Sequence, residues 1–84
     1  MNRKQRIDKI LSKKFNDFLL EIIDNSNLHQ GHNNFTGNDE THIKIILTKK
    51  NKIPINRLYI HKHINNLLEE EFKRGLHSLE IKIN

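Results

Sequence analysis

A long polar stretch between two apolar runs places the strongest constraint on how this chain can fold. The apolar runs are residues 18–23 and 41–48, and the stretch 24–40 between them is mostly polar and contains two of the three glycines. A connection of this length is uncommon in a small domain and usually carries function. We therefore expect two antiparallel strands joined by a wide loop, with a functional site at that loop.

Three segments have the residue pattern of strands. Residues 18–23 form a short apolar run bounded by Asn-Asp pairs, and residues 41–48 and 76–83 alternate apolar with polar side chains. Alternation with a period of two is typical of a strand that buries one face. The alternating apolar residues are Ile43, Ile45 and Leu47 in the second segment and Leu79, Ile81 and Ile83 in the third.

Two further segments have helical spacing. Residues 3–15 predict an amphipathic helix whose polar face is rich in Lys and Arg. Residues 57–73 predict a longer helix, which follows Pro54 and stops before Gly75. The expected buried stripe of this second helix is Ile60, Ile64, Leu67, Leu68 and Phe72.

The order helix, strand, strand, helix, strand, with a separate short helical turn at Pro54 left open before the long helix, predicts an α+β fold of two layers, in which a three-stranded sheet is packed by helices on one face. The 84 residues suffice for a single domain, residues 1–84. No apolar run approaches the length of a membrane span, and no secretory signal pattern follows the first Met. We therefore expect a cytoplasmic protein.

The chain is basic, with a net charge of +5. Basic residues gather around the turn before the second helix, where they could hold the phosphates of a nucleic acid. The alternative is an ordinary solvated surface, which we prefer because the chain has no Gly-x-x-Gly loop and only Tyr59 as an aromatic nearby. The candidate residues are Lys49, Lys50, Lys52, Arg57 and Lys62.

Six histidines and no cysteine define the metal chemistry open to the chain. Imidazole is the commonest metal ligand. His29 and His32 have a spacing found in zinc sites, but those sites also use cysteines. No motif places a serine beside a base, and no phosphate-binding glycine signature occurs, so we expect no enzyme.

Four motifs of this sequence resemble the BolA family. They are Leu-His-Gln-Gly-His at 28–32, Glu-Thr-His-Ile-Lys-Ile at 40–45, the helix from Ile60-His61-Lys62 to Glu71, and Gly-Leu-His-Ser-Leu at 75–79. The resemblance implies a core related to the type II KH fold and a non-catalytic role. It also implies a monothiol glutaredoxin as partner, with glutathione, and a [2Fe–2S] cluster shared in iron–sulfur trafficking. Alone, the chain would bind no cluster tightly and would be a monomer or weak homodimer.

By the same resemblance, His77 matches the family's cluster ligand before the last strand. His32 is the best match to the loop ligand, and His29 is the alternative. His61 matches the histidine of the family's Arg-His-Arg signature, but Ile60 and Lys62 replace the two arginines.

For three histidines the residues themselves leave a second interpretation open. His77 could instead stabilise the end of the preceding helix through its charge. His42 is expected to orient the loop by hydrogen bonding rather than to bind metal, and His61 to be a partly buried structural residue rather than a neighbour of the cluster ligands. The runner-up function is a nucleic-acid-binding regulator of transcription or stress response, which would use the basic turn and helix.

Overall fold

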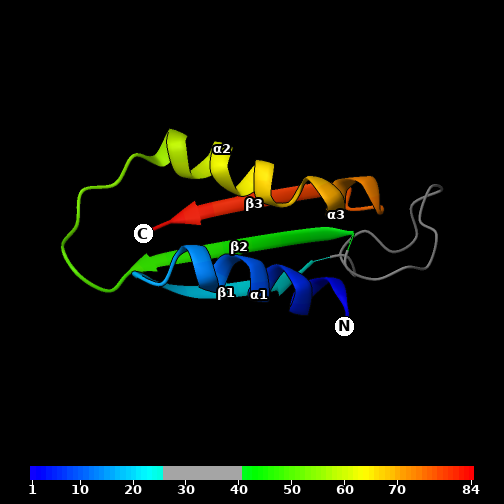
Figure 1. Ribbon diagram of the computed structural model, residues 1–84, viewed down its shortest axis with the longest axis horizontal. Coiled ribbons are helices and arrows are strands. Elements are labelled where there is room, and N and C mark those ends of the chain that lie inside the picture. Colours follow the sequence, from blue (N-terminus) through cyan, green and yellow to red (C-terminus); the bar gives the residue numbers. More distant parts are fainter. Residues whose placement is uncertain (26–40) are drawn as a thin grey trace.

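The elements of the computed structural model, which describes residues 1–25 and 41–84, follow the order expected from the sequence (Figure 1). The α+β class and the order of helices and strands are therefore confirmed. The elements are α1 (Arg3–Lys14), β1 (Phe18–Asp24), β2 (His42–Lys49), α2 (Arg57–Leu67), α3 (Glu69–Lys73) and β3 (Ser78–Ile83).

The three strands form one mixed sheet in the order β1-β2-β3. β1 runs antiparallel to β2, as expected of a wide hairpin, and Asp24 lies opposite Ile43. β3 runs parallel to β2, with Ser78 opposite His42. Parallel neighbours need a crossover connection, which α2 and α3 supply.

Both long helices cover the same face of the sheet, so the fold has the two expected layers (Figure 1). On β2 the alternation predicted from the sequence holds, because Ile43, Ile45 and Leu47 are buried and their neighbours are partly exposed. The core joins residues of every sheet strand to residues of the helices. It comprises Ile7, Leu11, Phe15, Phe18, Ile22, Ile43, Ile45, Leu47, Ile60, Ile64, Leu68, Leu76 and Ile83.

α1 begins with a capping box and ends close to the expected boundary. The side chain of Asn2 accepts a hydrogen bond from the backbone of Gln5, and the Gln5 side chain accepts one from the backbone of Asn2. This exchange satisfies two amide groups that a helix start leaves unpaired. Phe15, predicted as the last helical residue, is the C-cap.

The prediction of one continuous helix over residues 57–73 was wrong. The helix is interrupted at Leu68, which ends α2 and precedes α3, with φ −101° and ψ 14°. Beyond this interruption Glu71 is buried at 3% exposure, whereas Phe72, placed on the buried stripe by sequence, is 37% exposed. Glu71 consequently lies in the first turn of a helix, where a carboxylate is favoured.

The third strand begins at Ser78, two residues later than expected. Gly75 has a φ of 114°, and the amide of Leu76 donates back to the carbonyl of Glu71 at 3.0 Å. This bond, with that from the Gly75 amide to the Phe72 carbonyl at 3.3 Å, is the Schellman pattern of a helix end. Leu76 is buried at this turn, and His77 leads directly into β3.

None of the helices in the described residues has the length and apolar character needed to cross a membrane.

Candidate functional site

His77 lies in an exposed position at the end of the sheet where β2 and β3 begin. Its backbone amide donates to the carbonyl of Thr41 at 2.8 Å, and the amide of Ser78 donates to the same carbonyl at 3.1 Å. Thr41 is itself buried, at 7% exposure. The backbone of His77 is therefore fastened to the start of the central strand, while its side chain stays accessible.

His42 is the histidine that the structure brings next to His77. The two rings stack, with centroids 6.1 Å apart and planes inclined by 18°. His42 Nδ1 and the hydroxyl of Thr41 are within hydrogen-bond distance at 3.0 Å. Such a bond to one ring nitrogen orients the imidazole ring and thereby its other nitrogen.

The long loop starts and returns beside this pair of histidines. Asp24 is opposite Ile43 in the sheet, and the amide of Asn25 donates to the carbonyl of His42 at 2.8 Å. The residues on either side of the connection, Asn25 and His42, are therefore hydrogen-bonded to each other. The predicted loop ligands, His29 and His32, lie outside the described residues, so both remain predictions.

The structure does not bring His61 to His77. His61 lies in the first half of α2 and is half-buried. α2 starts at the end of the sheet where β2 ends, whereas His77 lies where β2 begins (Figure 1). The backbone carbonyl of His61 accepts a hydrogen bond from the Asn65 side chain at 2.7 Å.

The basic residues predicted from the sequence lie at the opposite end of β2 from His77. Lys49 is the last residue of β2, Lys50 and Lys52 lie in the exposed turn after it, and Arg57 starts α2. Lys62 is exposed on α2. Nothing in the geometry adds to their assignment as contacts for nucleic acid, which stays a prediction.

Two rings lie together on α2 near the basic turn. His63 stacks on Tyr59, with ring centroids 5.6 Å apart, and meets Phe15 edge-on at 5.8 Å. Tyr59 is therefore part of a small ring cluster with His63 and Phe15.

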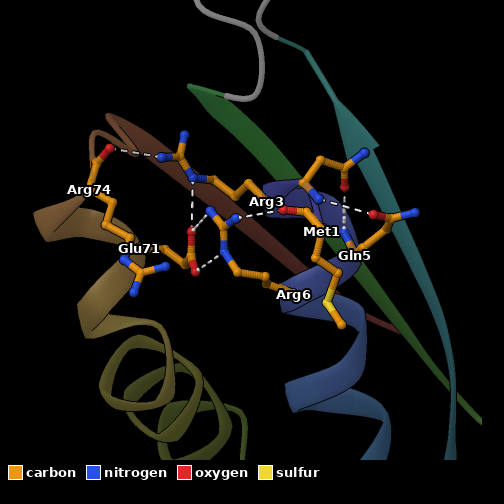
Figure 2. A network of polar contacts seen from close by, with 7 residues as sticks. Met1, Arg3, Gln5, Arg6, Glu71 and Arg74 are labelled. Atoms are coloured by element: carbon orange, nitrogen blue, oxygen red, sulfur yellow. Dashed lines mark hydrogen bonds and ion pairs between the residues drawn. The ribbon is translucent and has the colours of Figure 1, made fainter.

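A buried ion cluster between α1 and α3 was missed by the sequence reasoning (Figure 2). Arg3 Nε and Arg6 Nη2 both reach Glu71 Oε1, at 3.0 and 2.8 Å, and Arg6 Nε donates to Glu71 Oε2 at 2.8 Å. A signal was present in the sequence, because Arg3 shares the helical stripe of Ile7 and Leu11. A cation on an apolar stripe predicts a buried acidic partner.

Hydrogen bonding from Arg6 is the main reason that the pKa of the Glu71 carboxyl lies below its ordinary value of 4.5. Burial acts in the opposite direction, since it disfavours the charged form. The hydrogen bond from Arg3 and the positive charges of both guanidinium groups add to the lowering. Glu71 is therefore a carboxylate at neutral pH.

Over the ranges 1–25 and 41–84, no three His, Cys, Asp or Glu side chains gather closely enough to hold a metal ion.

The family model for BolA-like proteins matches residues 11–84. The chain belongs to the BolA-like family. Chloroplastic BOLA1 of Arabidopsis thaliana is 35% identical over 82 residues, an alignment that covers 95% of this chain and 51% of that protein. The chain thus spans about half the length of this relative.

Two solved structures from Arabidopsis thaliana have the same fold. BolA1 superposes with a TM-score of 0.79 and 34% identity, and covers the whole of this chain and 92% of its own. The BolA domain of SufE1 gives a TM-score of 0.78 and 31% identity, with the same coverage of both chains.

Membership of the BolA-like family bears on two expectations from the sequence. Proteins of this family are generally non-catalytic, which agrees with the absence of a catalytic motif in the sequence. The iron–sulfur role expected from the same resemblance stays a prediction.

Proposed function

We propose that this BolA-like protein is a non-catalytic partner of a monothiol glutaredoxin and shares a [2Fe–2S] cluster with it. In this proposal His77 is one ligand of the cluster, and a histidine of the loop, His32 or alternatively His29, is the second. The cluster is cargo in iron–sulfur trafficking. The observation that carries the proposal is the exposed, backbone-fastened position of His77 at the base of the loop.

The chemistry of imidazole supports His77 in this role. Imidazole nitrogen is an accepted ligand of iron, and in Rieske centres histidines replace two of the four cysteines of a [2Fe–2S] cluster. A ligand for a shared cluster must be reachable by a second protein, and His77 is exposed. Its backbone bond to the Thr41 carbonyl limits the conformations that the ligand must lose on binding.

The absence of cysteine supports a shared cluster rather than one held by this chain alone. A [2Fe–2S] cluster needs four protein or small-molecule ligands, and thiolates supply at least half of them in known types. This chain has no cysteine. A glutaredoxin cysteine and glutathione are the thiols that we propose as the remaining ligands.

The chain connectivity allows a loop histidine to reach His77. His29 is four residues beyond Asn25, whose amide bonds to His42. An extended chain spans at most about 3.5 Å per residue, so His29 can be about 14 Å from this anchor. His32, three residues further along, has a longer reach, so both histidines stay candidates.

His42 has a supporting role in this proposal. Its ring stacks on that of His77, and its Nδ1 is engaged with the Thr41 hydroxyl. Groups that contact a ligand without binding the metal commonly fix its orientation and tune the metal. We assign His42 to that function. His61 lies on α2, away from the start of β2, and we leave it outside the site.

The test is to mix the protein with a cluster-loaded monothiol glutaredoxin and glutathione, and to follow visible absorbance, circular dichroism and molecular size together. We expect a one-to-one complex whose cluster spectrum differs from that of glutaredoxin alone. His77→Ala should abolish that spectral change and leave the fold intact. His61→Ala is the matched control, and should leave the spectrum of the complex unchanged.

Two results would reject the proposal. One is the absence of a complex at micromolar concentrations. The other is a complex in which His77→Ala leaves the cluster spectrum as it was. Parallel His32→Ala and His29→Ala variants decide which loop histidine is the second ligand.

A further inference from the structure

We infer that Arg3 is a positioning residue for His77: it ties the turn that carries this histidine to the buried carboxylate of Glu71. The inference rests on the proposed function only in so far as His77 is the ligand being positioned. The geometric claim concerns this chain alone, and it involves residues from opposite ends of the sequence.

Glu71 is the fixed point of the arrangement. Its side chain is 4% exposed, and both carboxylate oxygens accept hydrogen bonds from guanidinium groups of α1. Charge-assisted bonds to a buried carboxylate are about twice as strong as neutral ones and have little freedom to move. Figure 2 shows the two arginines of α1 converging on Glu71 of α3.

Among the described residues, Arg3 bonds two partners through two different nitrogens. Its Nε donates to Glu71 Oε1 at 3.0 Å, and its Nη2 donates to the backbone carbonyl of Arg74 at 3.0 Å. Arg74 is the C-cap of α3, a position whose carbonyl has no partner within the helix. Arg3 therefore connects the buried carboxylate directly to the end of the helix.

The residues after Arg74 transmit this restraint to His77. Gly75 has a φ of 114°, and Arg3 Nη2 would be 3.7 Å from a Cβ at this position, so the guanidinium lies against the turn. Leu76 is buried and its amide is bonded to the Glu71 carbonyl. His77 follows immediately, and its amide reaches Thr41. Glu71 thus holds the turn twice, through its own carbonyl and through Arg3.

Arg6 provides a matched comparison within the same cluster. It binds the same carboxylate, with Nε and Nη2 both at 2.8 Å, but its Nη1 donates to the carbonyl of Met1 at 3.0 Å. Lysine in either position would keep the positive charge beside Glu71 and lose the second arm of the guanidinium fork. Only at Arg3 does that second arm reach the Arg74 carbonyl.

The experiment compares Arg3→Lys with Arg6→Lys in the full chain without a partner. Amide hydrogen exchange of His77 and Leu76 reports opening of the turn, and exchange of Ile45 in the central strand reports global unfolding. We expect Arg3→Lys to speed exchange at His77 and Leu76 by about tenfold relative to Ile45, because one charge-assisted bond is lost. The His77 ring resonances should shift as well.

Arg6→Lys should change exchange at all three amides by a similar factor, which is the signature of a purely structural residue. The same uniform change in Arg3→Lys, or no change at His77, would overturn the inference. Should Arg3→Lys not fold, Arg3→Gln, which is neutral but keeps an amide donor, takes its place and is read by the same ratio.

A second arm separates this inference from the proposed function. Each variant is then combined with cluster-loaded glutaredoxin. If Arg3→Lys loosens the turn while His77→Ala leaves the cluster spectrum unaltered, Arg3 positions His77 but His77 is no ligand. If Arg3→Lys and His77→Ala both alter the cluster spectrum, the positioning of His77 by Arg3 contributes to cluster binding.

Discussion

Among the described residues, Glu71 is a buried carboxylate, at 3% exposure. Its side chain is almost completely buried and is matched by two arginines, of which Arg3 is itself only 10% exposed. Such a cluster adds little net stability over an apolar core, but removing one member leaves the others buried without a counter-charge. The cost of losing Glu71 should therefore be large.

We expect Glu71→Gln to lower the free energy of unfolding by about 3 kcal/mol at pH 7. Domains of this size are stable by only about 5–15 kcal/mol, so the change should be plain in urea unfolding. Glu70→Gln is the control, because Glu70 is exposed and its ion pair with Lys73 is a surface contact. That control should lie within about 0.5 kcal/mol of the wild type.

The same variant should remove part of the pH dependence of stability. The pKa of Glu71 is lowered on folding, so its contribution is complete above the ordinary value of 4.5 and is lost as the pH falls through the lower, folded-state pKa. The difference in unfolding free energy between wild type and Glu71→Gln should accordingly shrink below about pH 4.5. A difference that stays constant down to pH 3 would contradict the ion cluster.

At the scale of secondary structure, the helical segment is interrupted at Leu68, just before the residues that contact α1. Leu68 is fully buried and joins α2 to α3, and beyond it Glu71 is buried while Phe72 is exposed. A continuous helix over the same residues would allow either Glu71 or Phe72 to face the core, because they lie three and four residues beyond Leu68. The choice between them selects an ion cluster over an apolar contact.

We expect unequal losses of unfolding free energy when two apolar residues of this segment, Leu68 and Phe72, are truncated. Leu68→Ala should cost about 2–5 kcal/mol, as expected for a fully buried leucine. Phe72→Ala should cost less than Leu68→Ala, because Phe72 is already 37% exposed and has less apolar surface to lose from the core. Chemical unfolding of both variants measures the comparison, and a cost for Phe72→Ala equal to that of Leu68→Ala would contradict the exposed position of Phe72.

At the scale of the whole molecule, the histidines and the basic turn occupy opposite ends of the sheet. His42 and His77 lie where β2 begins, and Lys49, Lys50 and Lys52 lie where it ends. β2 has 8 residues, whose seven intervals of about 3.3 Å place the two ends about 23 Å apart. The proposed cluster site and the basic turn are therefore separable by mutation.

Charge removal at the turn tests that separation. The double variant Lys50→Gln and Lys52→Gln should leave the complex with cluster-loaded glutaredoxin and its spectrum unchanged, because both exposed side chains are remote from His77. Size and visible absorbance measure the result. The same variant should weaken any binding to DNA and flatten its dependence on salt. Loss of the glutaredoxin complex would show that the basic turn belongs to that interface.

The sequence by itself determined the class of fold and most of the elements. Period-two alternation and helical stripes reflect which face of an element avoids water, and that preference is local to each segment. It also determined that the chain offers no thiolate. The structure, by starting the last strand at Ser78 rather than at residue 76, decided that His77 precedes it. The resemblance of four short motifs then indicated the BolA-like family, which the family model confirms.

Only the tertiary structure decided which side chains meet. Arg3 and Glu71 are 68 residues apart, and His42 and His77 meet because β2 and β3 are parallel neighbours in a fixed register. Hydrophobic periodicity cannot predict such pairs, since it records burial and not partners. It also favoured Phe72 over Glu71, because a buried carboxylate is stable only when its arginine partners arrive from another helix.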